Sequence, residues 1–263
     1  MVLLLLAVSL LLGVLVNGLA DNLPDMREEA KFGDLLPVCR YCGATRKISD
    51  ASAFLSMFLR GGACARCRGP RVFRDLLVEG FLGISIPALW MAGIRSPMDL
   101  LTGSVILSAC VLMAVIDLEH RSVISGVVIG FGVLLLILAL LQGTSHFLWV
   151  LEGGAAGLVM MGFCYLLGWL LARLMNLGAG IEPLAGGDIW VGGIVGMMTG
   201  WPAIIPAIFL SIFLAGIFSI MIYLYHVIKR QPVKFITFAY APYLLLAALI
   251  VHFAGSYVVA QLT

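Results

Sequence analysis

Long apolar stretches alternate with short polar breaks along almost the whole chain. A helix needs about 20 apolar residues to cross the hydrocarbon core of a bilayer, and most of these stretches have that length. The pattern therefore predicts eight transmembrane helices, near residues 1–20, 76–94, 99–116, 123–141, 147–172, 189–202, 203–227 and 235–258. The sixth is short and rich in glycine, so a re-entrant segment is the alternative there.

Composition leads to the same class of protein. Of the 263 residues, 62% are hydrophobic and 11% are charged, which leaves too little polar sequence to cover a soluble globule. A membrane barrel would alternate apolar and polar residues, whereas residues 123–141 form a nearly continuous apolar run. We therefore expect an all-α polytopic membrane protein with a small polar insert after the first helix. The net charge of +2 gives no reason to expect nucleic acid as a partner.

Basic residues are distributed unevenly between the polar segments. Residues 21–75 hold ten of the sixteen Lys and Arg, and five more fall on the same side if the predicted helices cross the membrane in turn. Only Arg95 falls on the opposite side. By the positive-inside rule, this insert faces the cytosol.

Four cysteines stand in two C-x-x-C pairs within the insert, Cys39 with Cys42 and Cys64 with Cys67. Each pair offers two thiolates from a tight turn, and two pairs complete the tetrahedron of a structural zinc site. Disulfide bonds are the alternative, but the reducing cytosol disfavours them. The spacing predicts a structural zinc ion held by these four residues.

Two aspartates lie where apolar runs end on the predicted cytosolic side. Asp117 follows the third run, and Asp188 comes directly after Gly186 and Gly187. Ionisable groups at membrane depth are costly and usually functional. Two close carboxyl groups cannot both ionise cheaply, so one can polarise a carbonyl while the other activates water. The glycines leave room for a substrate backbone. The structural alternatives are an ion pair of Asp117 with Arg121 and a helix cap at Asp188.

In order and spacing these motifs resemble those of the type IV prepilin leader peptidases, GxGD-type aspartyl proteases of the bacterial inner membrane. The resemblance extends over essentially the whole chain. Its elements are GVLVNGLADNLP at 13–24, the paired cysteines, residues 74–79, IDLEH at 116–120, Gly187-Asp188, and FAYAPYLLLA at 238–247.

The resemblance implies cleavage of prepilin or pseudopilin precursors at the cytosolic face, with Asp117 and Asp188 as the catalytic pair. Such substrates belong to type IV pilus and type II secretion systems. Many members also methylate the new N-terminus with S-adenosylmethionine, and Glu79 and Asn17 are the candidate residues for that activity. The structural alternatives are an acid at the membrane interface for Glu79 and a hydrogen bond between helices for Asn17. The expected organisation is a first helix at 1–20, a cytosolic zinc insert at 21–75 and a membrane protease core at 76–263.

Several positions depart from the family pattern, among them Asn22, residues 50–53 and residues 123–125. Ala185 stands where the first glycine of the GxGD motif is usual, and Trp190 stands where a lysine is usual. Two other functions remain as alternatives: a non-catalytic assembly factor for pili or secretion, and a proton-coupled transporter that uses the two aspartates as a relay.

Overall fold

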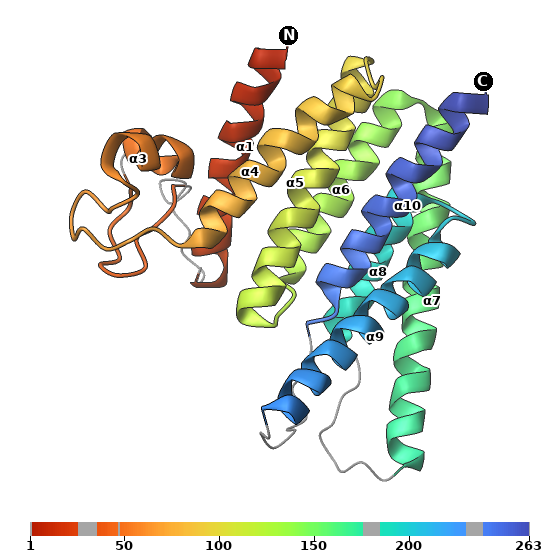
Figure 1. Cartoon of the computed structure of the whole chain (residues 1–263). Helices are drawn as coiled ribbons and strands as arrows, with labels where there is room; N and C mark the ends of the chain where they lie inside the picture. Colours follow the sequence, from red (N-terminus) through yellow and green to blue (C-terminus); the bar gives the residue numbers. More distant parts are fainter. Residues whose placement is uncertain (1, 26–35, 47, 176–184, 230–238, 263) are drawn as a thin grey trace. The chain divides into compact units, whose positions relative to one another are not determined.

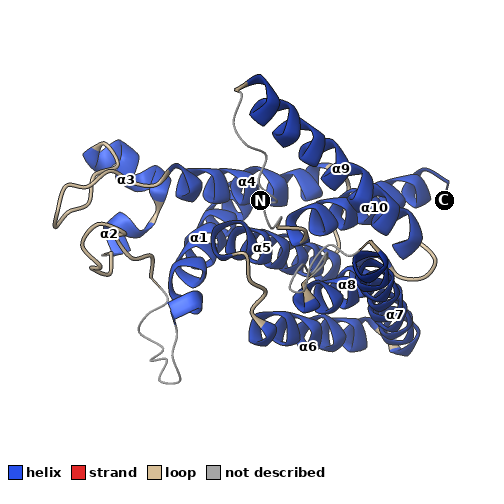
Figure 2. Ribbon diagram, turned by 90° about the horizontal axis from the view of Figure 1, so that it is seen from below, coloured by secondary structure: helices blue, strands red, loops and turns tan. Residues whose placement is uncertain are grey.

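The computed structural model describes residues 2–25, 36–46, 48–175, 185–229 and 239–262. Within these ranges the chain is helical and contains no strand, which confirms the all-α fold class (Figures 1 and 2). The basic positions Arg27, Lys31, Lys47, Arg230 and Lys234 lie outside the described residues, as does the start of the last predicted span.

The helices follow one another in a simple order along the chain (Figure 1). They are α1 (Val2–Asn22), η1 (Leu23–Asp25), α2 (Ile48–Ala51), α3 (Ala53–Arg60), α4 (Phe73–Met91), α5 (Pro97–His120), α6 (Ser125–Gln142), α7 (Thr144–Leu174), α8 (Gly186–Thr199), α9 (Ile204–Ile228) and α10 (Ala241–Leu262).

The predicted number of eight transmembrane helices was wrong. In the described part of the chain, five helices are long and apolar enough to cross a membrane: α1, α5, α6, α7 and α9. Helix α4 differs from these five because its first two turns carry three charged residues, Arg74, Asp75 and Glu79. Helix α8 has 14 residues and rises only about 21 Å, less than the hydrocarbon thickness of about 30 Å. The described apolar part of α10, Ala241–Gly255, is also shorter than a full span.

The chain forms two compact units, Met1–Ile116 and Asp117–Thr263. In the first unit α1 packs along α4. Gly13 of α1 makes this close approach possible, because a Cβ at that position would come within 2.9 Å of the Cα of Glu79. The side-chain amide of Asn17, one turn further along α1, donates to the carbonyl of Asp75 at 3.1 Å.

Ion pairs attach the insert to these two helices. Arg71 pairs with Asp75 at 2.9 Å and also donates to the backbone carbonyl of Asp50 at 3.0 Å. Arg74 bridges Asp21 of α1 at 2.7 Å and Asp75 at 3.0 Å. Most of these charged side chains are shielded from water. Burying any one of them without a partner would cost several kcal/mol, and the ion pairs offset this cost.

In the second unit α8 is held mainly by α7, along a seam of facing glycines. A Cβ on Gly157 would fall on the carbonyl oxygen of Gly192, and one on Gly196 would fall on the carbonyl oxygen of Gly153. Small residues spaced four apart allow membrane helices to approach at backbone distance, and both helices carry such a pair. Helix α10 then packs against α9 and α8.

Candidate active site and metal centre

Asp117 lies in the last turn of α5 and is 5% exposed. Its Oδ2 atom is fully buried and accepts no hydrogen bond from any described residue. The backbone N–H of Ala241, the first residue of α10, interacts with the same carboxyl group. No ion pair joins Asp117 to Arg121 among those found in the described part of the chain; the backbone N–H of Arg121 instead donates to the Asp117 carbonyl as an ordinary helical bond.

Asp188 is the third residue of α8 and is 4% exposed. Its Oδ2 accepts the backbone N–H of Ala185 at 3.2 Å, so the carboxylate caps the start of its own helix. The cap uses one lone pair of one oxygen, and a carboxylate has about four such sites. The carboxyl group of Asp117 also acts electrostatically on Asp188. Both aspartates therefore belong to the second unit, are shielded from water and lie within range of an electrostatic interaction with each other.

The two glycines before Asp188 occupy different surroundings. A Cβ on Gly187 would meet Cβ of Val123 at 2.7 Å, so this position needs glycine for the close approach of α8 to the loop before α6. A Cβ on Gly186, in contrast, would have no described heavy atom within 4 Å. Open space therefore adjoins the turn that leads into Asp188.

Tyr240 is a residue near this pair that the motif analysis did not single out. Its hydroxyl lies 2.6 Å from Oγ of Ser211 in α9, and the same hydroxyl interacts electrostatically with Asp188. Its place in the FAYAPYLLLA segment was visible in the sequence, but its proximity to Asp188 depends on how α8, α9 and α10 pack.

Glu79 lies in the first unit, fully buried in α4. Its carboxylate accepts the backbone N–H of Ala53 at 2.7 Å and that of Phe54 at 3.3 Å, and it also accepts the Ser52 hydroxyl at 2.8 Å. These groups form the N-terminus of α3, where an anion is favoured because the first N–H groups of a helix lack intrahelical partners. Glu79 thus contacts the insert itself, and its acceptor atoms are occupied there.

The four cysteines of the insert converge on one point. The sulfur atoms of Cys39, Cys42, Cys64 and Cys67 all lie within 4.8 Å of one another, and those of Cys39 and Cys67 are 3.7 Å apart. Four sulfurs at about 2.3 Å from a tetrahedral zinc ion would be separated by roughly 3.8 Å, so the cluster fits such an ion. All four cysteines are free thiols rather than disulfides.

One of these thiols is activated by the backbone around it. The N–H groups of Cys67 and Arg66 donate toward the Cys64 sulfur and lower the pKa of this thiol to about 6. At neutral pH that thiol is largely a thiolate, which is the form that binds a metal.

These observations describe a helical membrane protein with an insert whose four clustered cysteines could hold a metal ion, and with two buried aspartates. Residues 104–220, which include both aspartates, match the model of the type IV leader peptidase family. Over residues 104–220 the match agrees with the resemblance carried by the motifs around the two aspartates. No curated protein and no solved structure matches the chain.

Proposed function

We propose that the protein is an aspartic endopeptidase that removes the leader peptide of type IV prepilins or pseudopilins. The observation that supports this most strongly is that Asp117 and Asp188 are both nearly fully buried and interact electrostatically, inside the region that matches the peptidase family. The groups that interact with the pair include the backbone N–H groups of Ala185 and Ala241 and the hydroxyl of Tyr240.

The chemistry follows from two carboxyl groups that share one proton. Close carboxylates removed from water do not both ionise, and the pair titrates as a unit. The ionised member takes a proton from a water molecule, and the protonated member donates a hydrogen bond to the scissile carbonyl. Because neither step forms a bond to the enzyme, no acyl intermediate is expected. The open space beside Gly186 is where the substrate backbone would reach the pair.

The proposal places this site at the cytosolic face of the bacterial inner membrane. It rests on the excess of Lys and Arg in residues 21–75 and in the polar segments predicted to share their side. The substrate would lay its apolar helix in the bilayer and keep its basic leader in the cytosol. The scissile bond would then lie at the membrane interface, at the depth where α5 ends.

We extend the proposal to a zinc ion in the four-cysteine cluster and to methylation of the mature N-terminus with S-adenosylmethionine. The zinc would stabilise the insert, because four thiolates leave no open position for a water ligand. The carboxylate of Glu79 is engaged by the N-terminus of α3 and is not free to hold a cofactor. Glu79 and Asn17 would therefore serve methylation by holding the insert against α1 and α4.

The test is co-expression of the full-length protein with a prepilin, read as a shift in pilin size on a gel. Asp117→Asn and Asp188→Asn are each expected to abolish the shift. Asp99→Asn is the matched control, because Asp99 lies in the same helix as Asp117 but at its other, exposed end. Normal processing by either active-site variant would overturn the proposal. Mass spectrometry of the mature pilin tests methylation separately, as the gain of one methyl group.

A further inference from the structure

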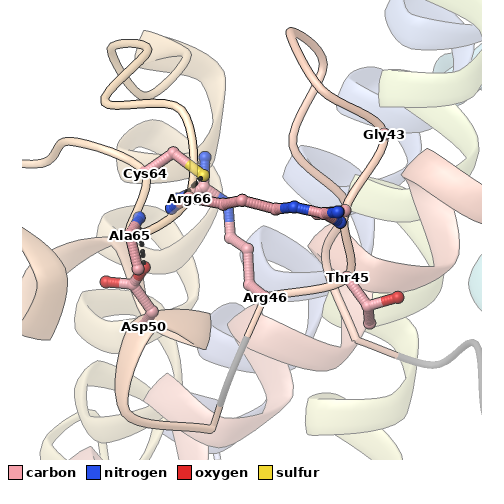
Figure 3. Close-up of a pocket in the computed structure, with 8 residues that line it drawn as sticks. Gly43, Thr45, Arg46, Asp50, Cys64, Ala65 and Arg66 are labelled. Atoms are coloured by element: carbon pink, nitrogen blue, oxygen red, sulfur yellow. Dashed lines mark hydrogen bonds between the residues drawn. The ribbon is translucent and has the colours of Figure 1, made fainter.

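The insert contains a pocket beside the cysteine cluster that the proposed protease chemistry does not use. It has a volume of about 590 Å³ and is lined by residues 43–46 and 64–66 together with Asp50 (Figure 3). Its walls come from both C-x-x-C turns, so the fold of the metal centre also shapes the pocket. This volume lies in the range that accommodates small organic ligands.

Arg46 is the most unusual residue of this pocket. It is only 6% exposed, yet Nε and Nη1 of its guanidinium are buried and have no hydrogen-bond partner among the described residues. The cysteine sulfurs are not partners either, so a metal-bound thiolate does not account for these open donors. An ionised group shielded from water without a partner is expensive, and buried guanidinium donors normally meet an acceptor.

Hydrogen bonds of the backbone fix the main chain at Arg46. Its N–H donates to the carbonyl of Pro37 at 3.0 Å. The preceding turn is closed by the N–H of Gly43, which donates to the carbonyl of Cys39 at 2.8 Å, and a β-bridge joins Thr45 to Val38. The guanidinium is thus presented by a fixed turn.

A second arginine enters the pocket from the opposite turn. Arg66 follows Cys64, and Figure 3 shows its side chain reaching across the pocket toward Thr45. The acidic lining residue, Asp50, accepts the backbone N–H of Ala65 through Oδ2 at 3.3 Å, whereas its Oδ1 is buried and accepts no hydrogen bond from a described residue. The pocket is therefore lined by two positively charged groups, the guanidinium groups of Arg46 and Arg66, and by one negatively charged group, the carboxylate of Asp50.

We infer that this pocket binds a small molecule through an anionic group, a carboxylate or a phosphate, which accepts hydrogen bonds from the open donors of Arg46. Arg66, which is exposed, closes over the same anion. Nε and Nη1 of Arg46 lie on different edges of the guanidinium group, so the bound anion must offer more than one oxygen. Carboxylate and phosphate both do. The rest of the pocket holds the body of the ligand. This inference does not depend on peptide cleavage by the two aspartates.

The test uses purified, metal-loaded, full-length protein in detergent and isothermal titration with inorganic phosphate or acetate, at ionic strength held constant with chloride. Saturable binding of at least one of these anions is expected, and the tighter one identifies the anionic group. Arg46→Gln should weaken binding about tenfold or more, because a hydrogen bond to a charged group is lost. Arg68→Gln is the matched control: Arg68 is exposed, belongs to the same insert and does not line the pocket.

The metal content of each variant reports whether the insert has folded. If Arg46→Gln loses the metal, Arg66→Gln replaces it, because that side chain is exposed and its backbone contact to Cys64 remains. This variant should also weaken binding, while Arg68→Gln leaves it unchanged. Saturable binding of neither anion, or equal binding by the wild type and a folded pocket variant, overturns the inference.

Discussion

The glycine seam between α7 and α8 offers a sharp test of how the protein positions Asp188. In Gly157→Ala the new Cβ would fall on the carbonyl oxygen of Gly192 and lie 2.9 Å from its carbonyl carbon. Ordinary contact begins at about 3.4 Å, so the two helices must part by roughly half an ångström or more. The neighbours are backbone atoms, so no side-chain rotation can relieve the clash.

The cost can be estimated from two effects. Overpacking in a tight interior costs about 1–3 kcal/mol, and a gap of 0.5–1 Å forfeits roughly a quarter to a half of the dispersion attraction between the parted surfaces. We expect a loss of about 3 kcal/mol in the free energy of unfolding, the upper end of the overpacking range. The reason is that the new Cβ meets backbone atoms of α8, which cannot move aside as a side chain can. Since α8 carries Asp188, cleavage of the prepilin should fall as well.

Gly162→Ala is the control for this prediction. Gly162 lies in the same helix, and no described heavy atom lies within 4 Å of its Cβ position. Both substitutions raise the helix propensity of α7 equally, so the difference between them isolates the clash. The free energy of unfolding is measured in mixed micelles by titration with a denaturing detergent. Equal stability of the two variants would refute the reasoning.

Two further predictions concern the insert. Cys39→Ser should remove the bound metal, measured as zinc per protein by elemental analysis, whereas Cys110→Ala in α5 should keep it; full retention in Cys39→Ser would contradict a four-cysteine site. Glu79→Gln places an amide N–H₂ against the donors of α3 and should weaken docking of the insert by about 1–3 kcal/mol. Limited proteolysis should then cut the insert faster in Glu79→Gln than in Glu152→Gln, whose side chain is exposed; equal rates would speak against this role for Glu79.

The sequence was sufficient for those features that depend on local pattern. Apolar runs predicted an all-α fold because a helix in lipid must satisfy its own backbone, and that class is confirmed. The spacing of Cys39, Cys42, Cys64 and Cys67 predicted that the four sulfurs would meet, and they do. The number of spans was overestimated because α4 carries charged residues in its first two turns and α8 has only 14 residues, as the short, glycine-rich sixth run had already suggested.

Contacts between distant segments could not be predicted from the chain. The hydrogen-bond partners of Glu79 are 25 to 27 residues away at the start of α3, and no periodicity shows that an acid in α4 will cap a helix of the insert. Tyr240 reaches Asp188 only through the packing of three helices. The open donors of Arg46 are likewise a property of the folded turn, because an arginine in a polar segment normally lies in solvent.

The most direct test of the central claim is a cleavage assay with purified protein and a purified prepilin, in which Asp117→Asn, Asp188→Asn and the double variant are compared with Asp99→Asn. If the two carboxyl groups work as one unit, each single variant should lose about a hundredfold to ten-thousandfold in rate. The double variant should then lose little more. Near wild-type cleavage by either single variant would show that the pair is not the catalytic centre.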